Sequence, residues 1–427
     1  MIALDLSRLL SRAGRGTPTG IDRVELAYAE HLAGNGGAAC FTALTASGRL
    51  ALLPQQAAEQ LIAATGAAWR GMLDAPSHDK QVRQIARQVR LALLASRERA
   101  LLSRLRSTKA RPVYLLVSHH HLERQNLVAR LKERSAARFI CLIHDLIPIE
   151  FPEYAKPGQA EHHLRRIETA ARLADAVIVN SAVTRDSLQP HLDRAGRRPP
   201  VLVAPFGADL PAAASGGDAP FGRPYFVYVS TIEARKNHLL LLNLWRWLAT
   251  DLGDRAPLLV LVGQRGWETE NVVDMLERCP ALRGAVIEHN SLPDAEMVRL
   301  VKGARALLLP SFAEGFGFPL IEGLELGVPA LCSDIPALRE TGGSVPEFLN
   351  PLDGPGWRAA VLDYALSRSP RRDAQLKRLA DWQPPRWEDH FAIVDRFIAE
   401  VAADTVAAGS AVARDGGPRP PGRSARR

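Results

Sequence analysis

The chain has 427 residues, of which 47% are hydrophobic, so it can bury more than one core. Its four scattered cysteines lack metal-ligand spacing, which favours reduced, buried thiols and a cytoplasmic location. No run approaches the roughly 18 apolar residues needed to span a bilayer, and Asp5 interrupts the apolar start that a signal peptide would have.

The net charge of +8 is concentrated in one segment. Residues 70–111 hold eleven arginines or lysines against three carboxylates, so this segment alone accounts for the excess. Apolar periodicity over residues 76–107 predicts one or two basic amphipathic helices. Such helices either lie on an anionic membrane or have a solvated basic face, and both alternatives stay open. Nucleic acid is not favoured, because no aromatic side chains are available there for base stacking.

At the start of the chain, residues 2–6 form a plausible strand, followed by glycines 14, 16 and 20 and a helical pattern from Ile21 to Leu32. The spacing is G-x-G-x-x-x-G with Pro18 inside, and the first glycine comes eight residues after the strand. A dinucleotide fingerprint needs G-x-G-x-x-G directly after a strand. A dinucleotide oxidoreductase is therefore the least favoured class.

Two later strands of the first half end in polar residues. Residues 113–118 precede three consecutive histidines, 119–121, which point in different directions and do not suggest a metal site. Residues 139–143 precede His144 and Asp145. Because doubly wound sheets bind ligands outside the carboxyl ends of their strands, His144 is a candidate site residue. The histidines at 119–121 are weaker candidates on the acceptor side.

Residues 210–224 have the composition of a linker, and a new strand follows at 225–229. After this strand come Arg235 and Lys236, at the predicted start of a helix. Cationic side chains beside the free N–H groups of a helix start form a phosphate site. We therefore expect Lys236, and with it Arg235, to bind phosphate.

The most informative stretch is residues 306–340, where a short apolar strand leads into Glu314-Gly-Phe-Gly-Phe. Pro319 fits a first helical position and Gly327 fits the end of that helix. The loop and the helix start predict an anion site. Two carboxylates, Glu314 and Glu322, flank it and are better suited to hydroxyl groups than to phosphate. A ligand with phosphate and polyol groups, such as a nucleotide sugar, fits both features.

The spacing from Glu314 to Glu322 resembles the E-x7-E signature of retaining GT-B glycosyltransferases of the family 4 type. Residues 144–154 resemble the HDLIP-x-x-x-PEY pattern of bacterial polysaccharide mannosyltransferases. The resemblance implies an α/β fold of the GT-B kind, in which two Rossmann-like doubly wound domains face each other across a cleft.

The same resemblance implies roles for the loop residues. Glu314 would contact the donor sugar, the amides of Gly315, Phe316 and Gly317 would contact sugar and diphosphate, and Glu322 would hold the nucleotide ribose. No protein nucleophile is implied.

Further donor-side roles follow from the other resembling segments. His144 would lie beside the donor sugar, and Lys236 would bind the diphosphate. The family's usual arginine would fall at position 231, which is Thr231 here, so Arg235 is a possible substitute. The loop with Gly20 and Arg23 would approach the donor from across the cleft.

The resemblance also implies a domain organisation. The expected parts are an acceptor-side domain at 1–209 with the basic insertion at about 70–111, a linker at 210–224, a nucleotide-sugar domain at 225–380, a helix at 381–402 that crosses back, and a disordered tail at 403–427.

The implied function is transfer of a hexose from a nucleoside diphosphate sugar to a hydroxyl of a surface polysaccharide or lipid-linked glycan. GDP-mannose is the favoured donor. No cofactor or metal is expected, since cationic side chains can stabilise the leaving diphosphate and no D-x-D pair occurs. The partners would be donor, acceptor and an anionic membrane at the inner face. The alternatives are a silent sugar-binding module, a phosphorylase and a nucleotide-sugar epimerase.

Overall fold

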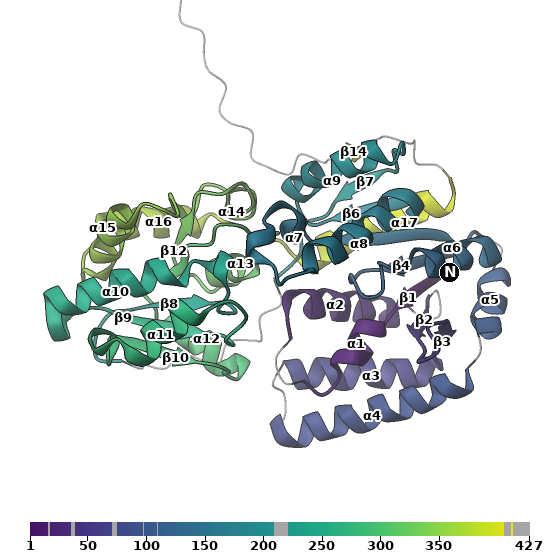
Figure 1. Cartoon of the computed structure of the whole chain (residues 1–427), viewed down its shortest axis with the longest axis horizontal. Helices are drawn as coiled ribbons and strands as arrows, with labels where there is room; N and C mark the ends of the chain where they lie inside the picture. Colours follow the sequence, from purple (N-terminus) through teal and green to yellow (C-terminus); the bar gives the residue numbers. More distant parts are fainter. Residues whose placement is uncertain are drawn as a thin grey trace, which may run out of the picture.

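The computed structural model of the chain describes residues 1–15, 18–35, 39–70, 75–96, 98–108, 110–208, 221–404 and 411–412. Within these residues the chain forms two sheets, each covered by helices on both faces, as Figure 1 shows. All strand pairings but one are parallel among the described residues, the exception being β2 with β3. The predicted α/β class with two doubly wound sheets is therefore confirmed.

In its described part the first sheet has eight strands, in the order β14-β7-β6-β5-β4-β1-β2-β3. The strands are β1 (Ile2–Asp5), β2 (Ala39–Leu44), β3 (Leu50–Leu52), β4 (Val113–Leu116), β5 (Arg138–Ile143), β6 (Ala176–Val179), β7 (Val201–Val203) and β14 (Ala411–Val412).

The second sheet has six described strands, in the order β10-β9-β8-β11-β12-β13. They are β8 (Tyr225–Val229), β9 (Leu258–Val262), β10 (Val286–His289), β11 (Leu307–Leu309), β12 (Ala330–Ser333) and β13 (Glu347–Leu349).

The helices are distributed along the whole chain. Those up to β7 are α1 (Ser7–Arg12), α2 (Gly20–Gly34), α3 (Gln55–Trp69), α4 (Ala75–Ala95), α5 (Glu98–Arg106), α6 (Gln125–Ser135), α7 (Ile147–Glu150), α8 (Gln159–Leu173) and α9 (Ala182–Arg194). Those after it are α10 (His238–Leu252), α11 (Glu270–Arg278), α12 (Asp294–Lys302), α13 (Phe318–Glu325), α14 (Pro336–Gly342), α15 (Gly354–Ala365), α16 (Pro370–Ala380) and α17 (Trp387–Ala402).

Both faces of each sheet are buried, which explains why the central strands are continuously apolar. In β5, Ile140 and Leu142 face one core, whereas Phe139, Cys141 and Ile143 face the other. The second sheet divides its side chains between two further cores in the same way. Side chains alternate along a strand, so a strand between two helical layers needs apolar residues at every position.

The last long helix, α17, belongs to a core of the first sheet although it follows the second sheet in the chain. Its Phe391, Val394 and Phe397 pack in the cluster that contains Leu4 of β1. His390 is fixed by two hydrogen-bonding contacts of its ring, one with the Tyr28 hydroxyl (2.9 Å) and one with the Pro205 carbonyl (3.0 Å). The chain therefore returns to its N-terminal half along α17.

Both sheets change winding direction at their middle. The first sheet does so between β1 and β4, and the second between β8 and β11. Loops at the carboxyl ends of such a strand pair diverge to opposite faces and leave room for a ligand. The two switch points are therefore where ligands are expected.

Several elements differ from the sequence-based expectations. Strands β2, β3 and β13 and helix α1 were not predicted, and neither were helices α15 and α16. Residues 210–220 of the predicted linker lie outside the described residues. The same holds for Gly16, Arg97, Lys109 and most of the tail. We propose that the two sheets with their helices are separate domains, at 1–209 and 225–380.

Burial of histidines makes stability depend on pH. Burial lowers the pKa of His390 and of His144 to about 4, from an ordinary 6.5. Below pH 6.5 the unfolded chain binds protons that the folded chain does not accept until about pH 4, so stability is full above 6.5 and is lost as the pH falls toward 4.

We predict that His390 alone lowers the free energy of unfolding by about 2 kcal/mol between pH 7.5 and pH 5. Urea denaturation at both pH values tests this in the wild-type chain and in His390→Gln, where that part of the loss should vanish. His289→Gln, at the end of strand β10, is the control. Equal pH dependence in wild type and His390→Gln would contradict the prediction.

Candidate active site

The loop after β8 brings two cations to the switch point of the second sheet. A short 3-10 turn, Ala234–Lys236, ends at Asn237, which has a left-handed φ of 56°. The Asn237 side-chain amide donates to the carbonyls of Pro310 (3.1 Å) and Pro351 (2.9 Å), which ties the loop to the ends of neighbouring segments. The Tyr228 hydroxyl donates to the Lys236 carbonyl (2.8 Å). The cationic loop is thus held by a buried polar framework.

Glu314, from the loop after β11, joins the two cations in a buried ion cluster. Lys236 Nζ lies 2.6 Å from Glu314 Oε1, and an Arg235 guanidinium nitrogen lies 3.0 Å from Oε2. The Ser311 hydroxyl donates to Glu314 (2.7 Å), and Glu233 pairs with Arg235 (2.7 Å). The side chains of Glu314 and Lys236 are only 7% and 9% exposed, so their ionised forms are stabilised by one another rather than by water.

The pKa shifts of Glu314 and Lys236 reflect the interaction between the charges of this cluster. Burial by itself would raise the pKa of Glu314, but the charges of Lys236 and Arg235 outweigh it and lower the pKa to about 2. Burial lowers the pKa of Lys236, with the Arg235 charge acting in the same direction and Glu314 opposing both. A negatively charged group added at this point would strengthen the charged form of Lys236.

The glycines after Glu314 allow a close approach to the other half of the molecule. A Cβ on Gly315 would lie 2.8 Å from the His144 carbonyl and 2.9 Å from Cβ of Asp145, so only glycine fits. The Ser181 hydroxyl donates to the Gly315 carbonyl (3.2 Å). Gly317 has a φ of 94° and precedes α13. The carboxyl edges of the two sheets therefore meet at this loop.

His144 follows β5 at this meeting point and is held firmly. Its ring donates from Nε2 to the Val117 carbonyl (2.8 Å), and its backbone N–H donates to His119 Nε2 (3.3 Å). Its carbonyl accepts from the Asn180 side chain (2.9 Å). Since burial lowers its pKa to about 4, the imidazole is neutral near pH 7. The Asp145 carboxylate accepts from the Ile147 backbone N–H (3.1 Å).

Other contacts join the halves around this loop. The backbone N–H groups of Ala182 and Val183, at the start of α9, donate to the Glu340 carboxylate of α14 (2.6 and 3.2 Å). Tyr154 stacks on Phe312 with ring centroids 5.7 Å apart. A carboxylate at a helix N-terminus is favourable because it meets unpaired N–H groups and the positive end of the dipole. Glu340 therefore links the two halves by charge.

The structure brings most of the predicted site residues to one region. Glu314, Lys236 and Arg235 form the ion cluster, and Gly315 connects it with His144. Phe316 packs against Phe206 of the first half, with ring centroids 5.1 Å apart.

Two further predicted residues lie nearby. A Cβ on Gly20 would lie 3.2 Å from the Phe318 ring at the start of α13, so the first glycine loop does reach the second half. Arg23 lies one turn further along α2, half-buried. Helix α13 begins at Phe318, one residue before the predicted Pro319, so Glu322 lies beyond the first helical turn, where it is half-buried.

Sequence reasoning missed some partners at this contact. Ser181 and Glu340 both join the two halves, and neither was predicted as a site residue. Ser311, which donates to Glu314, was not predicted either. The described residues contain no cluster of three or more His, Cys, Asp or Glu side chains placed to hold a metal, and none of their helices is long and apolar enough to cross a membrane.

Comparison with known proteins identifies the family. Residues 217–343 match the model described as glycosyl transferases group 1, and residues 117–191 match that of a glucosyltransferase 3-like N-terminal domain. The chain is 33% identical over 165 residues to O-antigen chain mannosyltransferase B of Escherichia coli. The aligned region covers 39% of this chain and 43% of that protein.

Two other similarities agree with this result. Serotype-specific mannosyltransferase WbdA of E. coli is 28% identical over 224 residues, covering 48% of this chain and 27% of that protein. The structure of sucrose-phosphate synthase from Thermosynechococcus elongatus superposes with a TM-score of 0.59 at 16% identity, covering 94% of this chain and 99% of that one, which shows the GT-B fold.

Residues 217–343 therefore carry a group 1 glycosyltransferase domain, and the chain as a whole is similar to the retaining GT-B glycosyltransferases of family 4. The matched part spans less than half the length of each of these two mannosyltransferases.

We predict that Glu314→Gln destabilises the chain by about 3 to 5 kcal/mol, because it leaves the buried Lys236 ammonium without its carboxylate and removes one of the two carboxylate partners of Arg235. Urea denaturation at pH 7 measures the change, and Glu296→Gln on exposed α12 is the control. The double variant Glu314→Gln/Lys236→Met should be less destabilised than the sum of the two single variants, since one orphaned charge is gone. Additive effects would contradict a coupled cluster.

We predict that Glu340→Ala speeds hydrogen exchange at the amides of Ala182 and Val183 about fivefold, because their carboxylate acceptor is removed; this corresponds to about 1 kcal/mol. Exchange measured by NMR at residue resolution tests this. Glu296→Ala should change neither amide. Unaltered exchange at both amides in Glu340→Ala would show that the carboxylate does not hold the two halves together.

Proposed function

We propose that this chain transfers a hexose, with mannose favoured, from a nucleoside diphosphate sugar to a hydroxyl of a surface polysaccharide or lipid-linked glycan, with retention. The observation that carries the proposal is the buried cluster of Glu314 with Lys236 and Arg235 at the switch point of the second sheet. The similarity to O-antigen mannosyltransferases supports mannose, and GDP-mannose is the favoured donor.

The ion cluster suggests how the donor binds. Two cations face two carboxylates, Glu314 and Glu233, so the empty site is close to neutral. The donor diphosphate brings its own negative charge and competes with Glu314 for Lys236. Once released, Glu314 can accept hydrogen bonds from sugar hydroxyls. After this exchange Lys236 has an anionic partner in the diphosphate and Glu314 has hydrogen-bond donors in the sugar, so neither buried group loses its polar contacts.

The same cations assist the reaction. Negative charge grows on the diphosphate as the bond to the sugar breaks, and Lys236 with Arg235 stabilises it electrostatically. The leaving diphosphate then takes the proton of the acceptor hydroxyl. His144 is a poor base near pH 7, because its pKa is about 4. We assign it to contact the donor sugar rather than to carry a proton.

The remaining site residues have binding roles in this proposal. The amides of Gly315, Phe316 and Gly317 contact the sugar and diphosphate, and Glu322 holds the ribose. Gly20 approaches the donor from the first half of the chain. Arg235 takes the place of the arginine that the family carries at position 231. We infer that the enzyme works in the cytoplasm, at the inner face of the membrane.

We predict that one nucleotide sugar from a panel with GDP, UDP, dTDP and ADP raises the melting temperature. A ligand at about 100 times its Kd stabilises the native state by about 2.7 kcal/mol. Glu322→Ala should abolish the shift, whereas Glu325→Ala, exposed on the same helix, should keep it.

The panel also separates the alternatives. A shift without any glycan product would favour a phosphorylase, an epimerase or a binding module. Absence of a shift for every nucleotide sugar would contradict the proposed donor site.

A further inference from the structure

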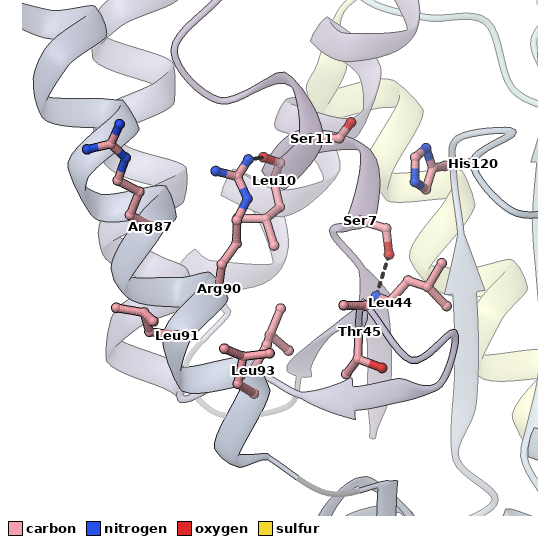
Figure 2. A pocket seen from close by; sticks show the side chains of 12 residues that line it. Ser7, Leu10, Ser11, Leu44, Thr45, Arg87, Arg90, Leu91, Leu93 and His120 are labelled. Atoms are coloured by element: carbon pink, nitrogen blue, oxygen red, sulfur yellow. Dashed lines mark hydrogen bonds between the residues drawn. The ribbon is translucent and has the colours of Figure 1, made fainter.

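A second pocket opens at the switch point of the first sheet. It has a volume of about 560 Å³, within the range of small-molecule sites. Its walls come from α1 after β1, from the turn after β2, from His120 after β4 and from one face of α4. Figure 2 shows α4 facing α1 and the β2 turn across this pocket. Nothing in the donor site accounts for it.

The pocket is mainly apolar and its outer wall is open to solvent. Leu91 and Leu94 of α4 are 65% and 72% exposed, whereas Leu93 and Leu10 close the pocket from inside. Residues three apart on a helix lie on the same face, so the two leucines form one exposed strip. Exposed leucines beside a hollow indicate a surface that an apolar ligand covers.

Two arginines of α4 stand beside this apolar wall. Arg90 reaches across the pocket and donates to the Leu10 carbonyl (2.6 Å), as the dashed line in Figure 2 shows. Arg87, one turn earlier, is exposed and has no recorded hydrogen bond or ion pair with the described residues. No carboxylate lines the pocket among the described residues. An anion attached to a hydrocarbon chain is the ligand that complements such a wall.

We propose that this pocket binds the lipid diphosphate of a lipid-linked acceptor, with the hydrocarbon chain along Leu91 and Leu94 and the diphosphate at Arg87. The proposal rests on the proposed function, whose acceptor it specifies. The pocket opens at the carboxyl edge of the first sheet, the edge from which β5 carries His144 to Gly315. A glycan attached to the diphosphate could therefore extend along this edge toward the donor site.

The concave shape favours a single lipid over a flat membrane surface. A bilayer would contact only the exposed strip on α4, whereas Leu10 and Leu44 line the hollow behind it. A single prenyl or acyl chain can fill the hollow as well as contact the strip. Binding to anionic vesicles alone is therefore the rival outcome.

The test is calorimetric titration of the full-length chain with farnesyl diphosphate, carried out with the donor site saturated by the nucleotide sugar that gives the thermal shift. Saturation prevents the diphosphate from binding at Lys236. Farnesol, inorganic diphosphate and vesicles of equal parts phosphatidylcholine and phosphatidylglycerol are titrated in parallel. Farnesyl diphosphate should bind more tightly than farnesol or diphosphate, because it uses both the apolar wall and the arginine.

Paired variants locate the site. Leu91→Asn/Leu94→Asn should weaken farnesyl diphosphate binding about tenfold or more, since both leucines lose apolar contact with the chain. Arg87→Gln should remove most of the preference for farnesyl diphosphate over farnesol. The matched controls Leu352→Asn and Arg246→Gln, exposed residues of the second half, should change neither affinity. All five substituted residues of these four variants are on the surface, so the variants should keep the donor thermal shift.

Three outcomes would overturn the proposal: no binding of farnesyl diphosphate, equal losses in the control variants, or binding to the anionic vesicles alone with the same loss in Arg87→Gln. A chain that responds to nucleotide sugars but not to farnesyl diphosphate refutes only this proposal. A chain that responds to no nucleotide sugar refutes the proposed donor site, and the pocket variants still decide where farnesyl diphosphate binds.

Discussion

The arrangement of the second half depends on one buried group of charges, in which Glu314 holds Lys236 and Arg235 together. The buried charges of Glu314 and Lys236, and that of the partly buried Arg235, are tolerated because each has a partner within hydrogen-bonding distance. The cluster fixes the loop after β8 against the loop after β11, at the one place in this sheet where the chain reverses its winding. In the proposed function these cations pass from Glu314 to a more strongly charged ligand, the diphosphate.

The glycine loop after Glu314 connects the ion cluster with the first half of the chain. Gly315 touches the backbone of His144, and Ser181 and Glu340 hold the same contact from either side. The donor-side cluster and the carboxyl edge of the first sheet are therefore parts of one region. The apolar pocket beside α4 lies at the switch point of that first sheet, so each sheet has a candidate ligand site at its corresponding position.

Much of this arrangement could be predicted from the sequence, because the signals lie in short runs of consecutive residues. The strands at 139–143, 225–229 and 306–309 are short apolar runs buried on both faces, and the loop at 314–318 carries its glycines and helix start in consecutive residues. The ion cluster could not be predicted, because Lys236 and Glu314 are 78 residues apart and meet only through the strand order. Strands β3 and β13 are three residues long, too short to give a periodic signal. The domain boundaries and the roles of the site residues remain predictions.

The proposed donor site requires that a nucleoside diphosphate take Lys236 from Glu314. A crystal structure of the chain with GDP, or with the nucleotide that the thermal panel selects, tests this directly. We expect phosphate oxygens within hydrogen-bonding distance of Lys236 and Arg235, with Glu314 turned toward the position of the sugar. A nucleotide bound elsewhere, with the pair of Lys236 and Glu314 intact, would contradict it.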